Sequence, residues 1–206
     1  MEMSLEHGLF YDGPLPEGKP YYQYCTAIPV GTMLAQTWNL PLLREVGTAV
    51  GKEMKIFGVQ LWLAPGMNIH RNPLCGRNFE YYAEDPLLSG RCAAAITNGV
   101  QSHPGIGTTI KHYACNNQED NRMASDSILT ERTLREIYLK GFEIAIREAK
   151  PRSIMTSYNL INGVHAANCY DICTKAARCE FGFDGVIMTD WTTTNVDDTC
   201  TASGCM

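Results

Sequence analysis

The stretch Gly185-Val-Ile-Met-Thr-Asp190-Trp191 decides how the fold is interpreted. Its apolar run is bounded by Gly182 on one side and by polar residues on the other, a pattern typical of a fully buried strand. The strand ends in a carboxylate, and burying a charge without partners is costly. Because catalytic residues of (β/α)8 barrels occupy the carboxyl ends of the strands, Asp190 is a candidate catalytic residue. An aspartate that caps a following helix is the alternative, and this stretch alone favours it.

Strands and helices alternate along the chain before this stretch. Asn39 and Pro41 mark the start of a helix whose apolar residues follow at spacings of three and four until Gly58. Similar patterns predict helices over 86–100, 130–149 and 170–181, and strands over 26–30, 59–64, 107–110 and 152–159. Repeated alternation of this kind predicts an α/β fold with a parallel sheet and crossover helices.

Two features favour a (β/α)8 TIM-barrel type over a doubly wound sheet. The chain has neither Gly-x-Gly-x-x-Gly after a strand nor a P-loop. Chemistry spread over several strand ends is typical of barrels. Polar residues recur here at the ends of successive predicted strands, namely Asn68, Lys111, His112, Tyr158, Asn159 and Asp190.

Length and charge limit the classes of function. A chain of 206 residues suits one main domain, which we place at 26–191 between a loop-rich segment, 1–25, and an irregular or truncated tail, 192–206. A net charge of −5 offers no basic surface for nucleic acid, and no apolar run approaches membrane-spanning length. The N-terminus lacks the pattern of a signal peptide, so we expect a cytoplasmic location.

The nine cysteines are an odd count at irregular spacing, which favours reduced thiols in the core. Cys169, Cys173 and Cys179 do not match the usual spacing of zinc ligands. We therefore expect neither a metal nor a cofactor.

If the strand ends meet, cationic and aromatic side chains surround Asp190. A carboxylate among cations has its charged form favoured, which suits a nucleophile and not a proton donor. Trp191 offers a face on which a sugar ring can stack, and the pattern suits the first carboxylate of a retaining glycosidase. The other members of this set are Arg77, Lys111, His112, Arg122 and Tyr158.

Each member also has an ordinary structural interpretation. Lys111 and His112 suit an ordinary pair at a strand end, and Arg77 and Arg122 suit salt bridges to Glu80 or Glu84. Asp85 before Pro86 favours a helix cap over a catalytic dyad. Packing is the usual role of a methionine such as Met155, and His70, His103 and His165 suit loops.

Four stretches in order closely resemble the glycoside hydrolase family 3 β-glucosidases. The resemblance is collinear from about residue 26 to residue 191. The stretches are Gly76-Arg77-Asn-Phe-Glu80-Tyr-Tyr-Ala-Glu84-Asp85-Pro86, Lys111-His112-Tyr-Ala-Cys-Asn-Asn-Gln-Glu119, Ser153-Ile-Met155-Thr-Ser-Tyr158-Asn159 and Phe183-Asp-Gly-Val-Ile-Met-Thr-Asp190-Trp191.

The resemblance implies roles for individual residues. Asp190 would be the catalytic nucleophile, and Trp191 would be a wall of the sugar subsite. Asp12 resembles an early sugar-binding aspartate of the family, although Leu15-Pro16-Glu17 replaces the usual Gly-Leu-Arg. Further subsite residues implied by the resemblance are Arg77, Lys111, His112, Arg122, Met155 and Tyr158.

The implied reaction is retaining, exo-acting hydrolysis of terminal β-linked sugars. Family enzymes are much longer, and their general acid is a glutamate from a second domain that follows the barrel. No residue of this chain matches that glutamate, so we expect an incomplete barrel with little or no turnover of cellobiose. Exposed strand edges predict self-association or pairing with a complementing C-terminal domain.

Two alternatives remain open at this level. A non-catalytic sugar-binding remnant, or an inactive fragment, would keep the cationic subsite without an acid. The second is an N-acetylhexosaminidase of the same family. Such enzymes typically carry Gly and Pro after the Lys-His pair, where this chain has Tyr113-Ala-Cys-Asn-Asn117, so the sequence disfavours this alternative.

Overall fold

The computed structural model describes residues 3–4, 9–10, 21–22 and 25–193. Three short strands near the N-terminus pair antiparallel in the order β1-β2-β3. They are β1 (Met3–Ser4), β2 (Leu9–Phe10) and β3 (Tyr21–Tyr22). Asp12 lies outside the described residues, so its sugar-binding role stays a prediction.

Four parallel strands form the central sheet of the described part of the chain. Their spatial order, β10-β7-β5-β4, is a steady progression along the sequence, as in consecutive units of a barrel. A doubly wound sheet would instead reverse its order at a switch point. The strands are β4 (Leu61–Trp62), β5 (Gly107–Tyr113), β7 (Ser153–Thr156) and β10 (Val186–Met188).

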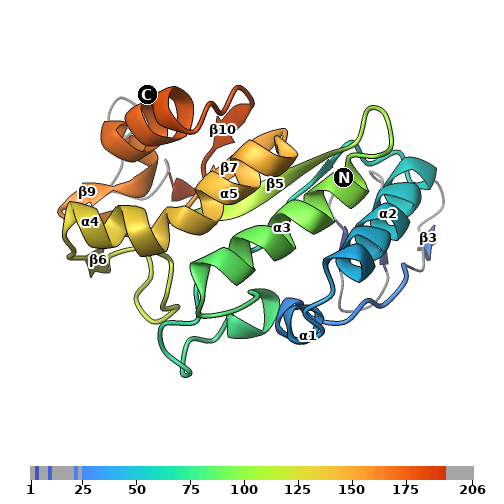
Figure 1. Cartoon of the computed structure of the whole chain (residues 1–206), viewed down its shortest axis with the longest axis horizontal. Coiled ribbons are helices and arrows are strands. Elements are labelled where there is room, and N and C mark those ends of the chain that lie inside the picture. The colour runs from blue at the N-terminus through green and yellow to red at the C-terminus, as the bar shows by residue number, and fades with distance from the viewer. Residues whose placement is uncertain (1–2, 5–8, 11–20, 23–24, 194–206) are drawn as a thin grey trace.

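Helices connect these strands and cover one side of the sheet. Figure 1 shows α5, α3 and α2 side by side, with α5 and α3 in front of β7 and β5. The helices are α1 (Gly31–Gln36), α2 (Leu40–Ile56), η2 (Asn78–Glu80), α3 (Pro86–Val100), α4 (Glu131–Thr133), η3 (Leu134–Tyr138), α5 (Lys140–Ala149), η4 (Ala166–Asn168) and η5 (Asp171–Glu180). The predicted α/β alternation is therefore confirmed.

Side-chain caps set the starts of the long helices where the sequence predicts them. Asn39 Oδ1 accepts the Leu42 N–H at 3.1 Å at the start of α2. Asp85 accepts the Leu88 N–H at 2.7 Å at the start of α3, which confirms its structural role. The predicted helix over 130–149 is instead divided, because η3 is π-helical and the Leu139 N–H reaches back five residues to the Leu134 carbonyl at 2.8 Å.

Glycines allow α2 and α3 to pack in close contact. A Cβ atom at Gly47 would lie 2.3 Å from the Ile96 carbonyl oxygen, and one at Gly99 would lie 2.2 Å from that of Arg44. Both positions therefore require glycine.

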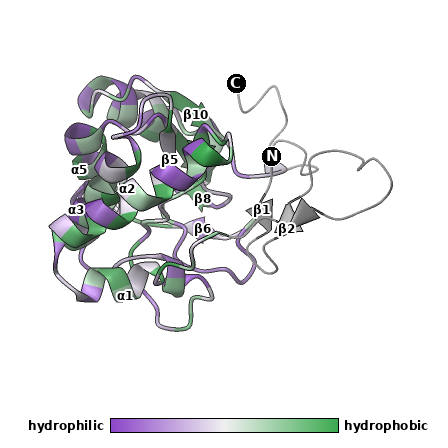
Figure 2. Cartoon of the chain, turned by 90° about the vertical axis from the view of Figure 1, so that its right-hand side faces the viewer, coloured by the Kyte–Doolittle hydropathy of each residue, from purple (hydrophilic) through white to green (hydrophobic). Residues whose placement is uncertain are grey.

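The core fills the space between the helices and the sheet. Ile110 of β5 and Ile154 of β7 are opposite each other in register and fully buried, and Phe142 of α5 belongs to the same cluster. In Figure 2, α3 and α5 carry both hydrophilic and hydrophobic bands, as expected of helices with one buried face. No helix among the described residues is long and apolar enough to cross a membrane.

Two local predictions are wrong. Residues 26–30 form no strand, because the Thr26 N–H bonds to the Glu53 carboxylate at 3.2 Å instead of to a neighbouring strand. β6 (Asp126–Ser127) pairs with β8 (Leu160–Ile161). β8 pairs in turn with β9 (Val164–His165), so His165, which was predicted to lie in a loop, lies in a strand. Pairing between distant segments leaves no local signal in the chain.

Candidate active site

Asp190 lies two residues beyond β10 and is buried, with 6% of its surface exposed. Its Oδ1 atom accepts the Trp191 N–H at 2.8 Å, and its Oδ2 atom lies 3.7 Å from His112 Nε2. The Thr193 N–H bonds to the backbone carbonyl of Asp190 and not to its carboxylate. The carboxylate is thus directed to the neighbouring strand ends, unlike that of an ordinary helix cap.

An irregularity in β5 positions the Lys111-His112 pair. The register against β7 shifts between Ile110 and Tyr113, as at a β-bulge, and such features change the direction of side chains beside active sites. Burial lowers the pKa of Lys111, and the nearby Arg77 lowers it further, whereas the carboxylates of Glu80 and Asp190 oppose this shift. The charge of Asp190 therefore acts on Lys111.

His112 is almost fully buried, at 1% exposed, and its backbone is fixed by Asn68. The Asn68 amide donates to the His112 carbonyl at 2.8 Å and accepts the His112 N–H at 2.9 Å. Burial lowers the pKa of His112 well below its usual range, and Arg77, Lys111 and Arg122 lower it further. The imidazole is consequently neutral at pH 7.

The two arginines of the predicted site each pair with a glutamate. Arg77 forms an ion pair with Glu80, as the structural alternative anticipated. Arg122 pairs with Glu119 at 2.8 Å and not with Glu80 or Glu84, because the turn after β5 brings residue 119 within reach. Both arginines still lie close enough for their charges to act on His112.

Tyr158 links Arg122 to the end of β10. The Arg122 guanidinium lies over the Tyr158 ring, 4.7 Å from its centroid. The Tyr158 hydroxyl donates to the Trp191 carbonyl at 2.6 Å. Burial raises the pKa of Tyr158, and the charge of Asp190 raises it further, so this residue donates a hydrogen bond and keeps its proton. The segments that follow β5, β7 and β10 are joined in this way.

The remaining predicted subsite residues differ in exposure. Met155 is buried at 2% exposed and lies opposite Met188 in the register of β7 and β10. Trp191 leaves 59% of its surface exposed beside the buried carboxylate. An exposed indole next to a buried charge is suited to stacking on a sugar ring.

Three residues of the local network were not predicted as site residues, namely Glu80, Tyr81 and Asn116. Glu80 binds Arg77, and the Tyr81 hydroxyl lies 3.2 Å from both His112 Nδ1 and Asn116 Nδ2. All three lie within the motif stretches that carry the family resemblance, which is the only sequence signal for Tyr81 and Asn116, whereas Glu80 was anticipated as a salt-bridge partner of Arg77. The contacts of Tyr81 with His112 and Asn116 join residues 31 and 35 positions apart, beyond the reach of periodicity.

The described residues contain no group of three or more His, Cys, Asp or Glu side chains that could hold a metal ion. Cys92 and Cys115 are buried thiols, and burial raises the pKa of Cys92 to about 11 and that of Cys115 to about 12. These thiols are therefore poor nucleophiles and poor ligands, and they act as small core residues.

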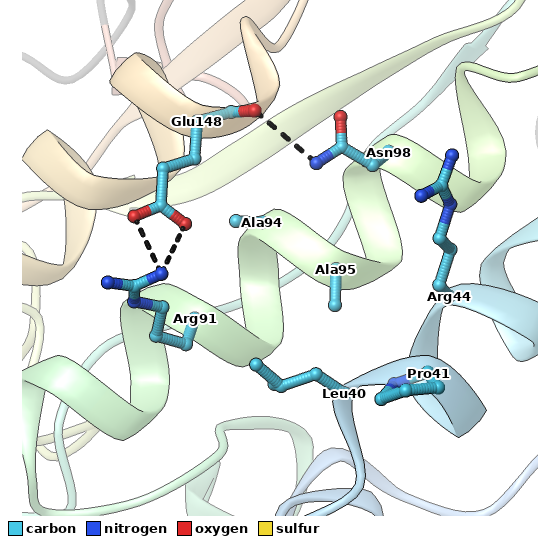
Figure 3. Close-up of a pocket in the computed structure, with 8 residues that line it drawn as sticks. All are labelled: Leu40, Pro41, Arg44, Arg91, Ala94, Ala95, Asn98 and Glu148. Atoms are coloured by element: carbon cyan, nitrogen blue, oxygen red, sulfur yellow. Dashed lines mark hydrogen bonds and ion pairs between the residues drawn. The ribbon is translucent and has the colours of Figure 1, made fainter.

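A separate groove of about 350 Å³ opens on the helix layer (Figure 3). The ion pair between Arg91 and Glu148, at 3.2 Å, crosses it, and the Asn98 amide donates to the Glu148 carbonyl at 3.3 Å. The groove contains none of the residues around Asp190 and is distinct from the candidate active site. Its lining residues are Leu40, Pro41, Arg44, Arg91, Ala94, Ala95, Asn98 and Glu148.

Comparisons with known proteins agree with this geometry. The sequence model described as "Glycosyl hydrolase family 3 N terminal domain" matches residues 18–203. A "Beta-glucosidase" from Ruminococcus albus is 48% identical over 190 residues, which cover 92% of this chain and 20% of the relative. An "Exo-alpha-(1->6)-L-arabinopyranosidase" from Bifidobacterium longum is 48% identical over 166 residues, covering 81% of this chain and 22% of the relative.

Solved structures give the same result. β-Glucosidase 3B from Thermotoga neapolitana, determined in complex with glucose, is 54% identical and superposes with a TM-score of 0.83. The match covers 87% of this chain and 25% of that structure. The predicted barrel type is confirmed, and the chain spans about a fifth of the length of the curated relatives.

Proposed function

The chain belongs to the N-terminal domain family of glycosyl hydrolase family 3, and from this premise we propose that it carries the nucleophile half of a retaining, exo-acting β-glucosidase. The observation that supports this most strongly is Asp190, a buried carboxylate at a strand end that is held by one N–H and faces the neutral His112. In the proposed reaction, Asp190 attacks the anomeric carbon and the glycosidic bond breaks. A glycosyl-enzyme forms, which water then hydrolyses.

The residues around Asp190 suit the binding of a single terminal sugar. Lys111 and Arg77 supply charged donors for hydroxyl groups, and the exposed Trp191 supplies an apolar face. The R. albus and T. neapolitana relatives are β-glucosidases, which supports glucose as the sugar. The B. longum relative is an arabinopyranosidase, which makes an α-L-arabinopyranoside the second substrate to test.

We propose that the general acid comes from outside the described residues. The two carboxylates joined to the network beside Asp190 are Glu80 and Glu119, and each is engaged by an arginine. A carboxylate held in this way serves as an acceptor and is unsuited to donating a proton to a leaving group. General acid help contributes about 10²–10⁴-fold. The chain should therefore cleave only substrates whose leaving group needs no proton.

The dependence of rate on the leaving group tests this function. The purified chain should release dinitrophenolate from 2,4-dinitrophenyl β-glucoside and should leave cellobiose intact, with the α-L-arabinopyranoside assayed in parallel. Proton NMR of the first product should show the β-anomer, as retention requires. Release of α-glucose first would contradict the nucleophile role. Glucose binding without any dinitrophenolate release would instead support a non-catalytic sugar-binding domain.

A further inference from the structure

Tyr81 contacts the side of the His112 ring that is turned away from Asp190. Its side chain is fully buried, directly after η2, and its hydroxyl lies 3.2 Å from His112 Nδ1. The two rings meet edge to face with centroids 6.1 Å apart. Tyr81 is therefore close enough to control which imidazole nitrogen carries the proton.

Asn116 determines which way the Tyr81 hydroxyl points. The Asn116 Nδ2 atom lies 3.0 Å from Glu119 Oε1 and 3.2 Å from the Tyr81 hydroxyl oxygen. Because Glu119 is a carboxylate bound to Arg122, it accepts from the amide and fixes the NH₂ group on this side. One N–H of Asn116 thus goes to Glu119, and the other goes to the Tyr81 oxygen.

With its oxygen accepting from Asn116, the Tyr81 hydroxyl is free to donate its own hydrogen to His112 Nδ1. This arrangement leaves the imidazole proton on Nε2, the atom that faces Asp190 Oδ2 at 3.7 Å. In the opposite tautomer, the Nε2 lone pair would face the carboxylate. The Tyr81 hydrogen would also lose its acceptor in a buried position, which is costly.

Asn68 is the competing partner of Nδ1. Its Oδ1 atom lies 3.3 Å from His112 Nδ1, which would favour a proton there. However, that oxygen already accepts the His112 backbone N–H at the shorter distance of 2.9 Å. The hydrogen-bond pattern is therefore more complete with the proton on Nε2.

We propose that Tyr81 is a positioning residue that holds His112 in the Nε2–H tautomer, so that the imidazole presents a donor to Asp190 and to a sugar hydroxyl beside it. The consequence for catalysis rests on the proposed function, whereas the tautomer is a property of the chain without substrate. The lowered pKa of His112, caused first by its burial, agrees with a neutral ring that has two distinct nitrogens.

Long-range ¹H–¹⁵N correlation spectra of the chain labelled with ¹⁵N-histidine measure the tautomer directly. His112→Gln assigns the signal among the five histidines. At about pH 7.5, above the ordinary histidine pKa, the wild type should show a protonated Nε2 and an unprotonated Nδ1. Tyr81→Phe should shift the proton toward Nδ1, where Asn68 accepts it. Tyr82→Phe, the same change at the next buried position, should leave the signal unchanged.

Asn116→Ala is a second variant, which keeps the Tyr81 side chain. If Tyr81→Phe does not fold, this variant tests whether the Tyr81 hydroxyl sets the tautomer of His112. It removes the donor that orients the hydroxyl, so the Nδ1–H population should rise. A wild type protonated on Nδ1, or a folded variant of Tyr81 or Asn116 with the wild-type tautomer, would overturn the proposal. Hydrolysis of the dinitrophenyl glucoside should fall about 10- to 100-fold in Tyr81→Phe, by analogy with the loss of an outer hydrogen-bond partner from a metal-ligating histidine. No hydrolysis by the wild type, with the expected tautomers, would refute the proposed function alone.

Discussion

The helix-facing side of the sheet and its carboxyl-terminal edge bury different kinds of side chain. Ile110 and Ile154 pack with apolar residues of α3 and α5 on the helix side. At the edge, Asp190, His112 and Asn68 are buried to a similar degree, although all three are polar. The first region gains stability from burial, whereas the second must offset the cost of removing polar groups from water.

This difference indicates that the carboxyl-terminal edge of the sheet serves chemistry and not stability. Hydrogen bonds offset the cost of burying its polar groups, from Asn68 to the His112 backbone and from the Trp191 N–H to Asp190. A polar network of this kind adds little to stability compared with an apolar core of similar size. Substitutions on the two sides should therefore separate into effects on stability and effects on chemistry.

The largest expected effect is on chemistry at the edge. Asp190→Asn keeps the size of the side chain and removes the nucleophile, so hydrolysis of the dinitrophenyl glucoside should fall on the order of 10⁴-fold or more. The free energy of unfolding in urea should change by less than about 1 kcal/mol. The variant loses the interactions of the carboxylate, but it also loses the cost of burying a charge. Unchanged hydrolysis by the variant would contradict the assignment of Asp190.

The next effect is on stability at the helix side. Ile154→Ala should lower the free energy of unfolding by about 2–5 kcal/mol, since it leaves a cavity in the packed core. Ile128→Ala is the matched control, because Ile128 is 77% exposed, and it should change the value by less than about 0.5 kcal/mol. Equal losses for both variants would remove the distinction between core and surface on which the comparison depends.

A smaller effect concerns pH. The pKa of His112 is lowered in the folded chain, so the unfolded chain binds the proton more tightly and stability falls as pH drops below about 6.5. The loss should reach up to about 1.4 kcal/mol per pH unit. Urea titrations of the wild type and His112→Gln between about pH 7.5 and pH 5 should show a weaker pH dependence in the variant. His103→Gln serves as the control, and parallel curves for His112→Gln and the wild type would contradict a buried neutral imidazole.

The smallest effect concerns the cap of α3. Asp85→Ala should lower the free energy of unfolding by about 1 kcal/mol, through loss of the bond to the Leu88 N–H. Hydrolysis of the dinitrophenyl glucoside by the folded variant should be unchanged, because the carboxylate caps a helix. Asp184→Ala, at an exposed position, controls for loss of charge. A large loss of activity in Asp85→Ala, but not in Asp184→Ala, would show that Asp85 takes part in the chemistry and is not only a helix cap.

Features with a local cause could be predicted from the sequence. Asn39 and Asp85 cap α2 and α3 where their side-chain types suggest, and Asp190 lies buried at a strand end. The motif stretches also identified Lys111 and His112 at the end of β5. The limits of the central domain, the cytoplasmic location and self-association stay predictions.

Features that depend on distant segments could not be predicted. The absence of a strand at 26–30 follows from a contact between Thr26 and Glu53, and β6 exists because β8 pairs with it. The contacts of Tyr81 with His112 and Asn116 likewise join separate loops. Neither hydrophobic periodicity nor turn residues predict such long-range contacts, so they can be identified only from the folded structure.

Mapping a trapped intermediate tests the central assignment most directly. The chain is incubated with 2,4-dinitrophenyl 2-deoxy-2-fluoro-β-glucoside, whose leaving group needs no general acid, and the adduct is located by peptide mass spectrometry. We predict one fluoroglucosyl group per chain, attached to Asp190 and absent from Asp190→Asn. An adduct on another carboxylate, or none on folded protein that binds glucose, would contradict the assignment of Asp190 as the nucleophile.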